Sequence, residues 1–140
     1  MKESNQLHAV CLDSYPPIAY MTDTSHQIVS LIHQYNSLKQ DTKVAYTFDA
    51  GPNACLFMLE SEVPIFYSFI KYYFLPSNGH TVIQGLPIPE HNHTQDEMDK
   101  VKIKQQKGSV KYVIHTKPGP GPHVLDQEDS LVNEQGLPKQ

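Results

Sequence analysis

The spacing of the apolar residues changes between Lys39 and Lys43, and this change constrains the fold more than any other feature. Before it, a helical spacing joins Ile28, Leu31, Ile32, Tyr35 and Leu38. A capping-box pattern at Thr24-Ser25-His26-Gln27 precedes them, so we predict an amphipathic helix over residues 25–39. After it, Val44, Tyr46 and Phe48 alternate with Ala45, Thr47 and Asp49, which predicts a strand over residues 43–49.

The rest of the chain supplies further helices and short strands around this pair. The predicted elements are a helix over 2–12, a strand over 54–59 that pairs as a hairpin with 43–49, a helix from Ser61 with a broad aromatic face, a loop over 75–94, a short lysine-rich helix over 97–106, and a strand over 109–116. This order predicts an α+β fold, with a small antiparallel sheet and helices on one face. We expect a single domain over residues 1–126 and a polar tail over 127–140.

Composition excludes several function classes. Of the 140 residues, 39% are hydrophobic and 19% are charged, and the formal net charge of −4 gives no basic excess for nucleic acid. No apolar run is long enough to span a bilayer, and the N-terminal residues lack the apolar stretch of a signal peptide. We therefore expect a cytosolic protein without a membrane span, and the sequence leaves the peroxisome open.

Cysteine and histidine residues give no metal pattern. Cys11 and Cys55 both lie among apolar residues, which favours buried reduced thiols over a disulfide. His91 and His93 lie in a polar, proline-containing segment. A solvated loop is favoured there over a metal site, since no third ligand is evident.

Asp49 is the candidate catalytic residue. The alternation places its side chain opposite the apolar face of the strand, and the small residues Ala50 and Gly51 follow it. A carboxylate in this position can accept a proton or orient a hydroxyl group. By spacing alone, an aspartate before Gly-Pro is more often an ordinary turn-forming residue.

Three segments resemble the diphosphomevalonate decarboxylases. They are residues 1–18 (MKESNQLHAVCLDSYPPI), 41–57 (DTKVAYTFDAGPNACLF) and 108–125 (GSVKYVIHTKPGPGPHVL). The run YTFDAGPNA is long and unusual, so the match is specific. The sequence departs from the family pattern at Glu3, where aspartate is usual, and at Cys55, where an aliphatic residue is common. Residues 75–107 match poorly and are expected to be a variable loop with a short helix.

The resemblance implies the C-terminal, ferredoxin-like domain of the GHMP-kinase fold, without its N-terminal partner domain. It implies an enzyme that uses ATP and Mg²⁺ to phosphorylate the tertiary hydroxyl of mevalonate 5-diphosphate. Loss of phosphate and carbon dioxide then gives isopentenyl diphosphate for isoprenoid and sterol synthesis. Asp49 would be the catalytic carboxylate, with Ala50, Gly51 and Asn53 shaping the loop around it. The family also implies a homodimer.

The phosphate-binding part of such an enzyme has no counterpart in the sequence. Gly119 and Gly121 alternate with prolines, which have no N–H to offer a phosphate, and they lead into no predicted helix. We therefore expect this chain alone to turn over little or no substrate. One hypothesis is a fragment or short form of the decarboxylase, and the alternative is a non-catalytic interaction or dimerisation module retained from it.

Overall fold

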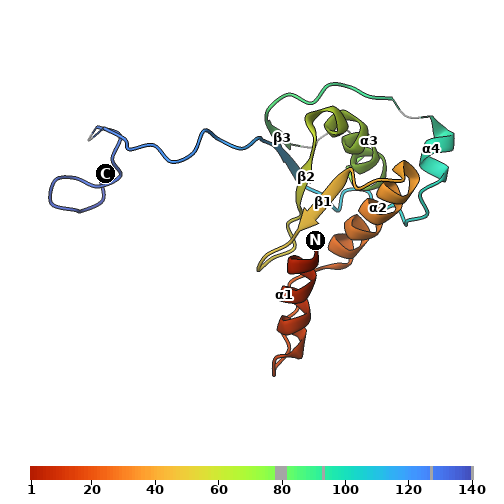
Figure 1. Ribbon diagram of the computed structural model, residues 1–140, viewed down its shortest axis with the longest axis horizontal. Coiled ribbons are helices and arrows are strands. Elements are labelled where there is room, and N and C mark those ends of the chain that lie inside the picture. The colour runs from red at the N-terminus through yellow and green to blue at the C-terminus, as the bar shows by residue number, and fades with distance from the viewer. Residues whose placement is uncertain (78–81, 93, 127, 140) are drawn as a thin grey trace.

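The computed structural model describes residues 1–77, 82–92, 94–126 and 128–139, and it confirms the α+β class (Figure 1). In chain order the elements are α1 (Lys2–Asp13), α2 (Asp23–Lys39), β1 (Val44–Thr47), β2 (Cys55–Met58), the 3-10 helix η1 (Glu60–Glu62), α3 (Val63–Tyr73), β3 (Val82–Gly85), α4 (Gln95–Asp99) and β4 (Tyr112–His115).

Helix α2 begins two residues earlier than the sequence predicted. Its N-cap is Thr22, whose Oγ1 accepts from the Ser25 N–H (3.3 Å), while Ser25 Oγ accepts from the Thr22 N–H (3.1 Å). The capping box expected at Thr24 and Gln27 is therefore wrong, because an equivalent pair lies two residues upstream. Most of the predicted apolar stripe is buried, but Leu38 is 42% exposed because the helix ends beside it.

The predicted hairpin is confirmed. Strands β1 and β2 pair antiparallel, with Val44 opposite Met58 and Thr47 opposite Cys55. Val44, Tyr46 and Phe48 are all buried, as their alternation predicted, and they face the helical layer. Cys11 and Cys55 are free thiols, as predicted, but neither is fully buried. Cys11 is half-buried, and Cys55 is exposed because it lies on the outward face of β2.

Helix α3 supplies the aromatic part of the core. Pro64 lies in its first turn, where a missing N–H costs nothing. The rings of Phe66 and Phe69 both meet the ring of Tyr35 edge-on, at centroid distances of 5.1 and 5.4 Å. The buried core contains Ile28, Leu31, Ile32, Tyr35, Val44, Tyr46, Phe48, Phe66, Phe69, Ile70, Tyr73, Phe74, Leu75, Met98 and Val101.

The second half of the fold differs from the prediction. Residues 82–85, expected to be loop, form strand β3, which pairs in parallel with β4. The predicted strand at 109–116 thus exists as β4, but it belongs to a second two-stranded sheet and does not extend the first. Helix α4 covers 95–99 rather than 97–106, since the chain bends after Lys100 and buries Val101 in the core.

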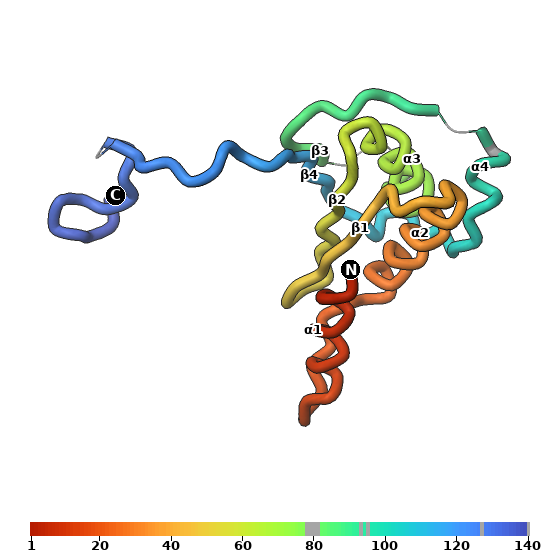
Figure 2. The backbone as a smooth tube through the Cα atoms, viewed as in Figure 1, coloured from red at the N-terminus to blue at the C-terminus, as the bar shows by residue number. Residues whose placement is uncertain are grey.

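The last residues leave the body of the molecule. The chain after β4 runs outward and ends in a small loop (Figure 2). An antiparallel bridge between Val132 and Pro138 closes this loop. In the described ranges, no helix is both long enough and apolar enough to cross a membrane.

Candidate functional site

Asp49 lies at the rim of the hairpin, two residues after β1 ends. Its side chain is exposed while that of Phe48 is buried. The two side chains therefore lie on opposite faces, as the alternation predicts. Its backbone carbonyl accepts from the Gly51 N–H (2.8 Å), which forms the local turn. Among the described residues, the Asp49 carboxylate has no hydrogen-bond or ion-pair partner, so it does not serve as a turn cap.

The other predicted loop residues show no special geometry. Ala50 and Asn53 are exposed and Gly51 is half-buried. A Cβ added at Gly51 would meet nothing within 4 Å, so space alone does not demand glycine there. Small side chains leave the backbone beside Asp49 open to approach by another molecule. The loop-shaping roles of Ala50, Gly51 and Asn53 stay predictions.

Two helices hold the two sides of this loop. On the strand side, the Ser4 hydroxyl of α1 accepts from the Phe48 N–H (2.8 Å) and donates to the Phe48 carbonyl (3.1 Å). On the far side, the Ser25 hydroxyl of α2 donates to the Pro52 carbonyl (3.1 Å). Residues 49–51 are therefore the part of the loop that lies between the two anchored residues.

Sequence reasoning missed both serines. Ser4 is 4% exposed and Ser25 is 1% exposed, and each contacts a residue far away in the sequence. The sequence places Ser25 inside the predicted capping box, and this gives no reason to expect a long-range contact. Ser4 lies within the MKESNQ segment that carries part of the family resemblance, and that segment was the only signal available.

The chemistry that this site can perform alone is limited to proton transfer and orientation. One exposed carboxylate can accept a proton from a hydroxyl group or hold that group by a hydrogen bond. Within the described residues, no group of three or more His, Cys, Asp or Glu side chains is placed to hold a metal ion. His91 is exposed, and His93 lies outside the described residues.

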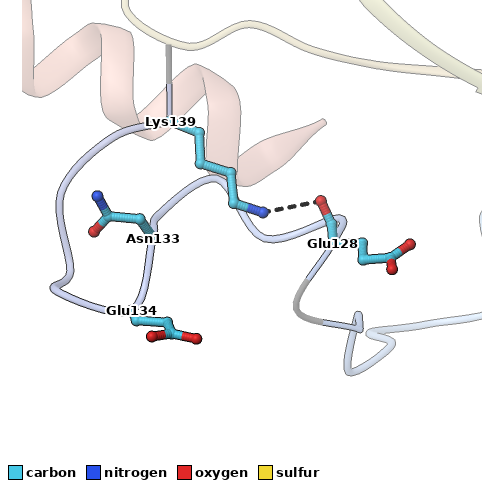
Figure 3. Close-up of a pocket in the computed structure, with 4 residues that line it drawn as sticks. All are labelled: Glu128, Asn133, Glu134 and Lys139. Atoms are coloured by element: carbon cyan, nitrogen blue, oxygen red, sulfur yellow. Dashed lines mark hydrogen bonds between the residues drawn. The ribbon is translucent and has the colours of Figure 1, made fainter.

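Two hollows on the described surface lie away from Asp49. A cavity of about 320 Å³ in the tail is lined by Glu128, Asn133, Glu134 and Lys139. Figure 3 shows that Lys139 Nζ donates to the Glu128 backbone carbonyl (3.0 Å) across it. A smaller hollow of about 150 Å³ lies between α2, α3 and α4, with Tyr35 and Lys39 in its wall. Neither includes Asp49.

Comparison with known proteins gives a consistent family match. Residues 1–125 match the family model described as mevalonate 5-diphosphate decarboxylase C-terminal domain. Two proteins named diphosphomevalonate decarboxylase, from Bos taurus and Homo sapiens, are 47% and 44% identical to this chain over 142 and 141 residues. Each alignment covers 99% of this chain and 35% of the relative, so the chain spans about a third of the length of these relatives.

A solved structure supports the same grouping. The mevalonate diphosphate decarboxylase from Trypanosoma brucei aligns with 94% of this chain and 36% of its own, with a TM-score of 0.70 and 26% sequence identity. A second structure, titled as a mevalonate 5-diphosphate decarboxylase, aligns with 72% of this chain at a TM-score of 0.51 and 38% identity.

Proposed function

The chain belongs to the family of mevalonate 5-diphosphate decarboxylase C-terminal domains, and from this we propose that it supplies the C-terminal part of a decarboxylase acting on mevalonate 5-diphosphate. The observation that carries the proposal is the match over residues 1–125, which includes the exposed Asp49. The product would be isopentenyl diphosphate, for isoprenoid and sterol synthesis. A cytosolic homodimer is part of the same proposal.

Asp49 has the role of the catalytic carboxylate in this proposal. Its carboxylate would accept the proton of the substrate's tertiary hydroxyl, or orient that hydroxyl, while the oxygen attacks the terminal phosphoryl group of ATP. Positioning and charge stabilisation dominate phosphoryl transfer, so the direction of this carboxylate matters as much as its basicity. Loss of the new phosphate together with carbon dioxide then completes the reaction.

ATP and Mg²⁺ belong to the proposed reaction, and we expect their phosphate site to lie outside this chain. In residues 117–122 one lysine is followed by alternating prolines and glycines, and no described helix begins after them that could direct its N-terminal N–H groups at a phosphate. We therefore assign ATP and metal contacts to the two thirds of the relatives that this chain does not match. Asp49 would face that part across the loop rim.

Exposed apolar residues on β2 support a second candidate, a non-catalytic interaction module. Phe57 is 60% exposed and Leu59 is 72% exposed, and both lie on or beside the outward face of the hairpin. Such residues often mark a surface that another protein segment covers. The two candidates differ in whether Asp49 is needed, since only the enzyme requires its carboxylate.

The test is a chimera in which the upstream two thirds of the Bos taurus relative is followed by this chain. We expect the chimera to release carbon dioxide from mevalonate 5-diphosphate in an ATP-dependent way, and this chain alone to release little or none. Asp49→Asn should lower turnover by about 10²- to 10⁴-fold, because an amide cannot accept the proton. The thermal midpoint should stay unchanged, since Asp49 has no described side-chain contact.

Asp13→Asn is the matched control, because Asp13 is an exposed carboxylate at the end of α1. It should leave turnover unchanged. Near-normal turnover in Asp49→Asn would remove Asp49 from the mechanism. A folded chimera with no turnover, beside an active Bos taurus parent, would contradict the enzymatic function of this chain and favour the interaction module.

A further inference from the structure

Ser4 forms an unusual double contact with the residue before Asp49. Its single hydroxyl accepts from the Phe48 N–H (2.8 Å) and donates to the Phe48 carbonyl (3.1 Å). A serine hydroxyl has one donor and two acceptor lone pairs, so both bonds can form together. The side chain thus replaces the two bonds that a neighbouring strand would make to Phe48.

The position of Ser4 within α1 shows that the helix itself does not need this serine. Ser4 lies in the first turn, but the helix has Met1 as N-cap and no side-chain cap bond. Alanine has a higher intrinsic helix propensity than serine, so the local sequence gains nothing from the hydroxyl. The contact with Phe48, across 44 residues of sequence, is what the hydroxyl serves.

Two neighbours in α1 reinforce the contact. His8 lies one turn after Ser4 on the same helix face, and its ring meets the Phe48 ring edge-on at a centroid distance of 6.4 Å. Asn5 Oδ1 accepts from the Tyr46 hydroxyl (3.0 Å). Both the backbone and the ring of Phe48 are therefore held by α1, immediately before the Asp49 loop.

We infer that Ser4 is a positioning residue, which fixes the end of the strand so that the Asp49 carboxylate points in one direction. The inference rests on the proposed role of Asp49. Phe48 is 2% exposed and its N–H and carbonyl meet a hydroxyl that is itself buried, so loss of the hydroxyl leaves both groups without a partner. The strand end would then shift or loosen, and the carboxylate would move with it.

The first test measures the contact in the chain itself. In Ser4→Ala, we expect the Phe48 amide to exchange its hydrogen about tenfold faster or more, as followed by NMR, because its acceptor is gone. Ser37→Ala is the matched control, since Ser37 is an exposed serine in α2, and the Phe48 rate should stay unchanged there. Unchanged protection of Phe48 in Ser4→Ala would overturn the inference.

The second test measures catalysis in the chimera. Ser4→Ala should lower kcat by about 10- to 100-fold, with little change in the KM for ATP or for mevalonate 5-diphosphate. The reason is that displacement of the Asp49 carboxylate weakens catalysis more than substrate binding. Ser4→Thr keeps the hydroxyl and should restore most of the loss. A merely structural role would reduce the amount of folded protein but leave kcat per folded molecule unchanged, and that result would overturn the inference.

The two proposals fail in different ways. If Asp49→Asn is active, the proposed function of Asp49 fails and the positioning role falls with it. If Asp49→Asn is inactive while folded Ser4→Ala keeps a normal kcat, only the positioning role of Ser4 fails.

Discussion

Tyr35 joins the hydrophobic core to a charged group. Its ring is 1% exposed, and its hydroxyl donates to Glu62 Oε2 at 2.6 Å. Burial raises the pKa of Tyr35 well above its ordinary value, and the hydrogen bond and negative charge of Glu62 raise this pKa further. The Tyr35 hydroxyl thus keeps its proton to a higher pH than the hydroxyl of a tyrosine in the unfolded chain.

Tyr35→Phe tests this contact. The ring packing against Phe66 and Phe69 is kept, while the bond to Glu62 is lost, so the free energy of unfolding at pH 7 should fall by about 1–2 kcal/mol. Urea denaturation measures this loss. Tyr112→Phe removes a hydroxyl from a side chain that is half exposed on β4 and should change the free energy by less than about 0.5 kcal/mol.

The same variant has a pH signature. Because the pKa of Tyr35 is raised on folding, its contribution to stability is fully present below the unfolded pKa of about 10 and is lost as the pH rises above it. Between pH 9 and 11 the parent should therefore lose more stability than Tyr35→Phe. Some alkaline loss should stay in the variant, since burial also raises the pKa of Tyr67 and Tyr73. Equal alkaline slopes would contradict the assignment.

At the residue scale, the sequence identifies those site residues that belong to a motif or to a local pattern of alternation. Asp49 followed from the resemblance and from its place in the alternation, and its exposure agrees with that place. Ser4 and Ser25 could not be predicted, because each bonds to a backbone carbonyl that only the tertiary structure brings near. Serine is common at helix starts for local reasons, so its presence there carries no long-range signal.

At the scale of elements, side chains satisfy both ends of the outer edge of β1. Asn36 Nδ2 donates to the Val44 carbonyl (2.8 Å), and Asn36 Oδ1 accepts from the N–H groups of Lys43 (2.9 Å) and Val44 (3.0 Å). Ser4 does the same for Phe48 at the other end. An open strand edge invites pairing with another chain, and these side chains occupy it instead.

Asn36→Ala should therefore destabilise the chain and expose this edge. We expect the free energy of unfolding to fall by about 1–3 kcal/mol, even though alanine favours a helix over asparagine by a few tenths of a kcal/mol. Asn36→Asp keeps the acceptor for the two amides and should lose less. Ser37→Ala, one residue along the same helix, should have almost no effect. Thermal or urea unfolding measures the loss of stability. Light scattering at increasing protein concentration should show more association in Asn36→Ala than in the parent. An unchanged free energy of unfolding in Asn36→Ala would contradict the role of Asn36.

Strand β3 shows why one element could not be predicted. The surrounding sequence is rich in proline and glycine, which indicates loop. Gly85 ends the strand with a φ of 85°, and a Cβ there would lie 2.1 Å from the His115 carbonyl oxygen. Glycine is therefore favoured here for two reasons, the left-handed φ and the close approach of β4. The need for glycine at this position comes partly from its contact with β4, which the local sequence does not reveal.

At the scale of the whole molecule, one core serves both small sheets. Leu56 and Met58 of the first sheet and Val113 of the second are half-buried against the same buried cluster. The spacing of apolar residues in α2, β1 and α3 predicted this core, because it marks one inward face on each of these elements. The separation into two sheets depends on which edges pair, and residue periodicity contains no such information.

The tail is the part of the molecule that this core does not include. Its described backbone hydrogen bonds, from Asp129 to Asp126 and from Lys139 to Leu131 for example, all lie within residues 126–139. Leu131 is 86% exposed, and the extended segment before it runs away from the body (Figures 1 and 2). The domain boundary near residue 126 stays a prediction, which truncation of the chain can test.

A chain that ends at Asp126 should keep the stability of the full chain. The deleted residues bury little apolar surface against the core, so the free energy of unfolding should change by less than about 0.5 kcal/mol, with the same denaturant slope. The matched control is a chain that ends at Lys111. It removes β4 with its half-buried Val113 as well as the tail, and it should unfold or lose several kcal/mol. If the chain ending at Asp126 loses more than about 1 kcal/mol, residues 127–140 pack on the body in solution and the domain extends beyond the predicted boundary.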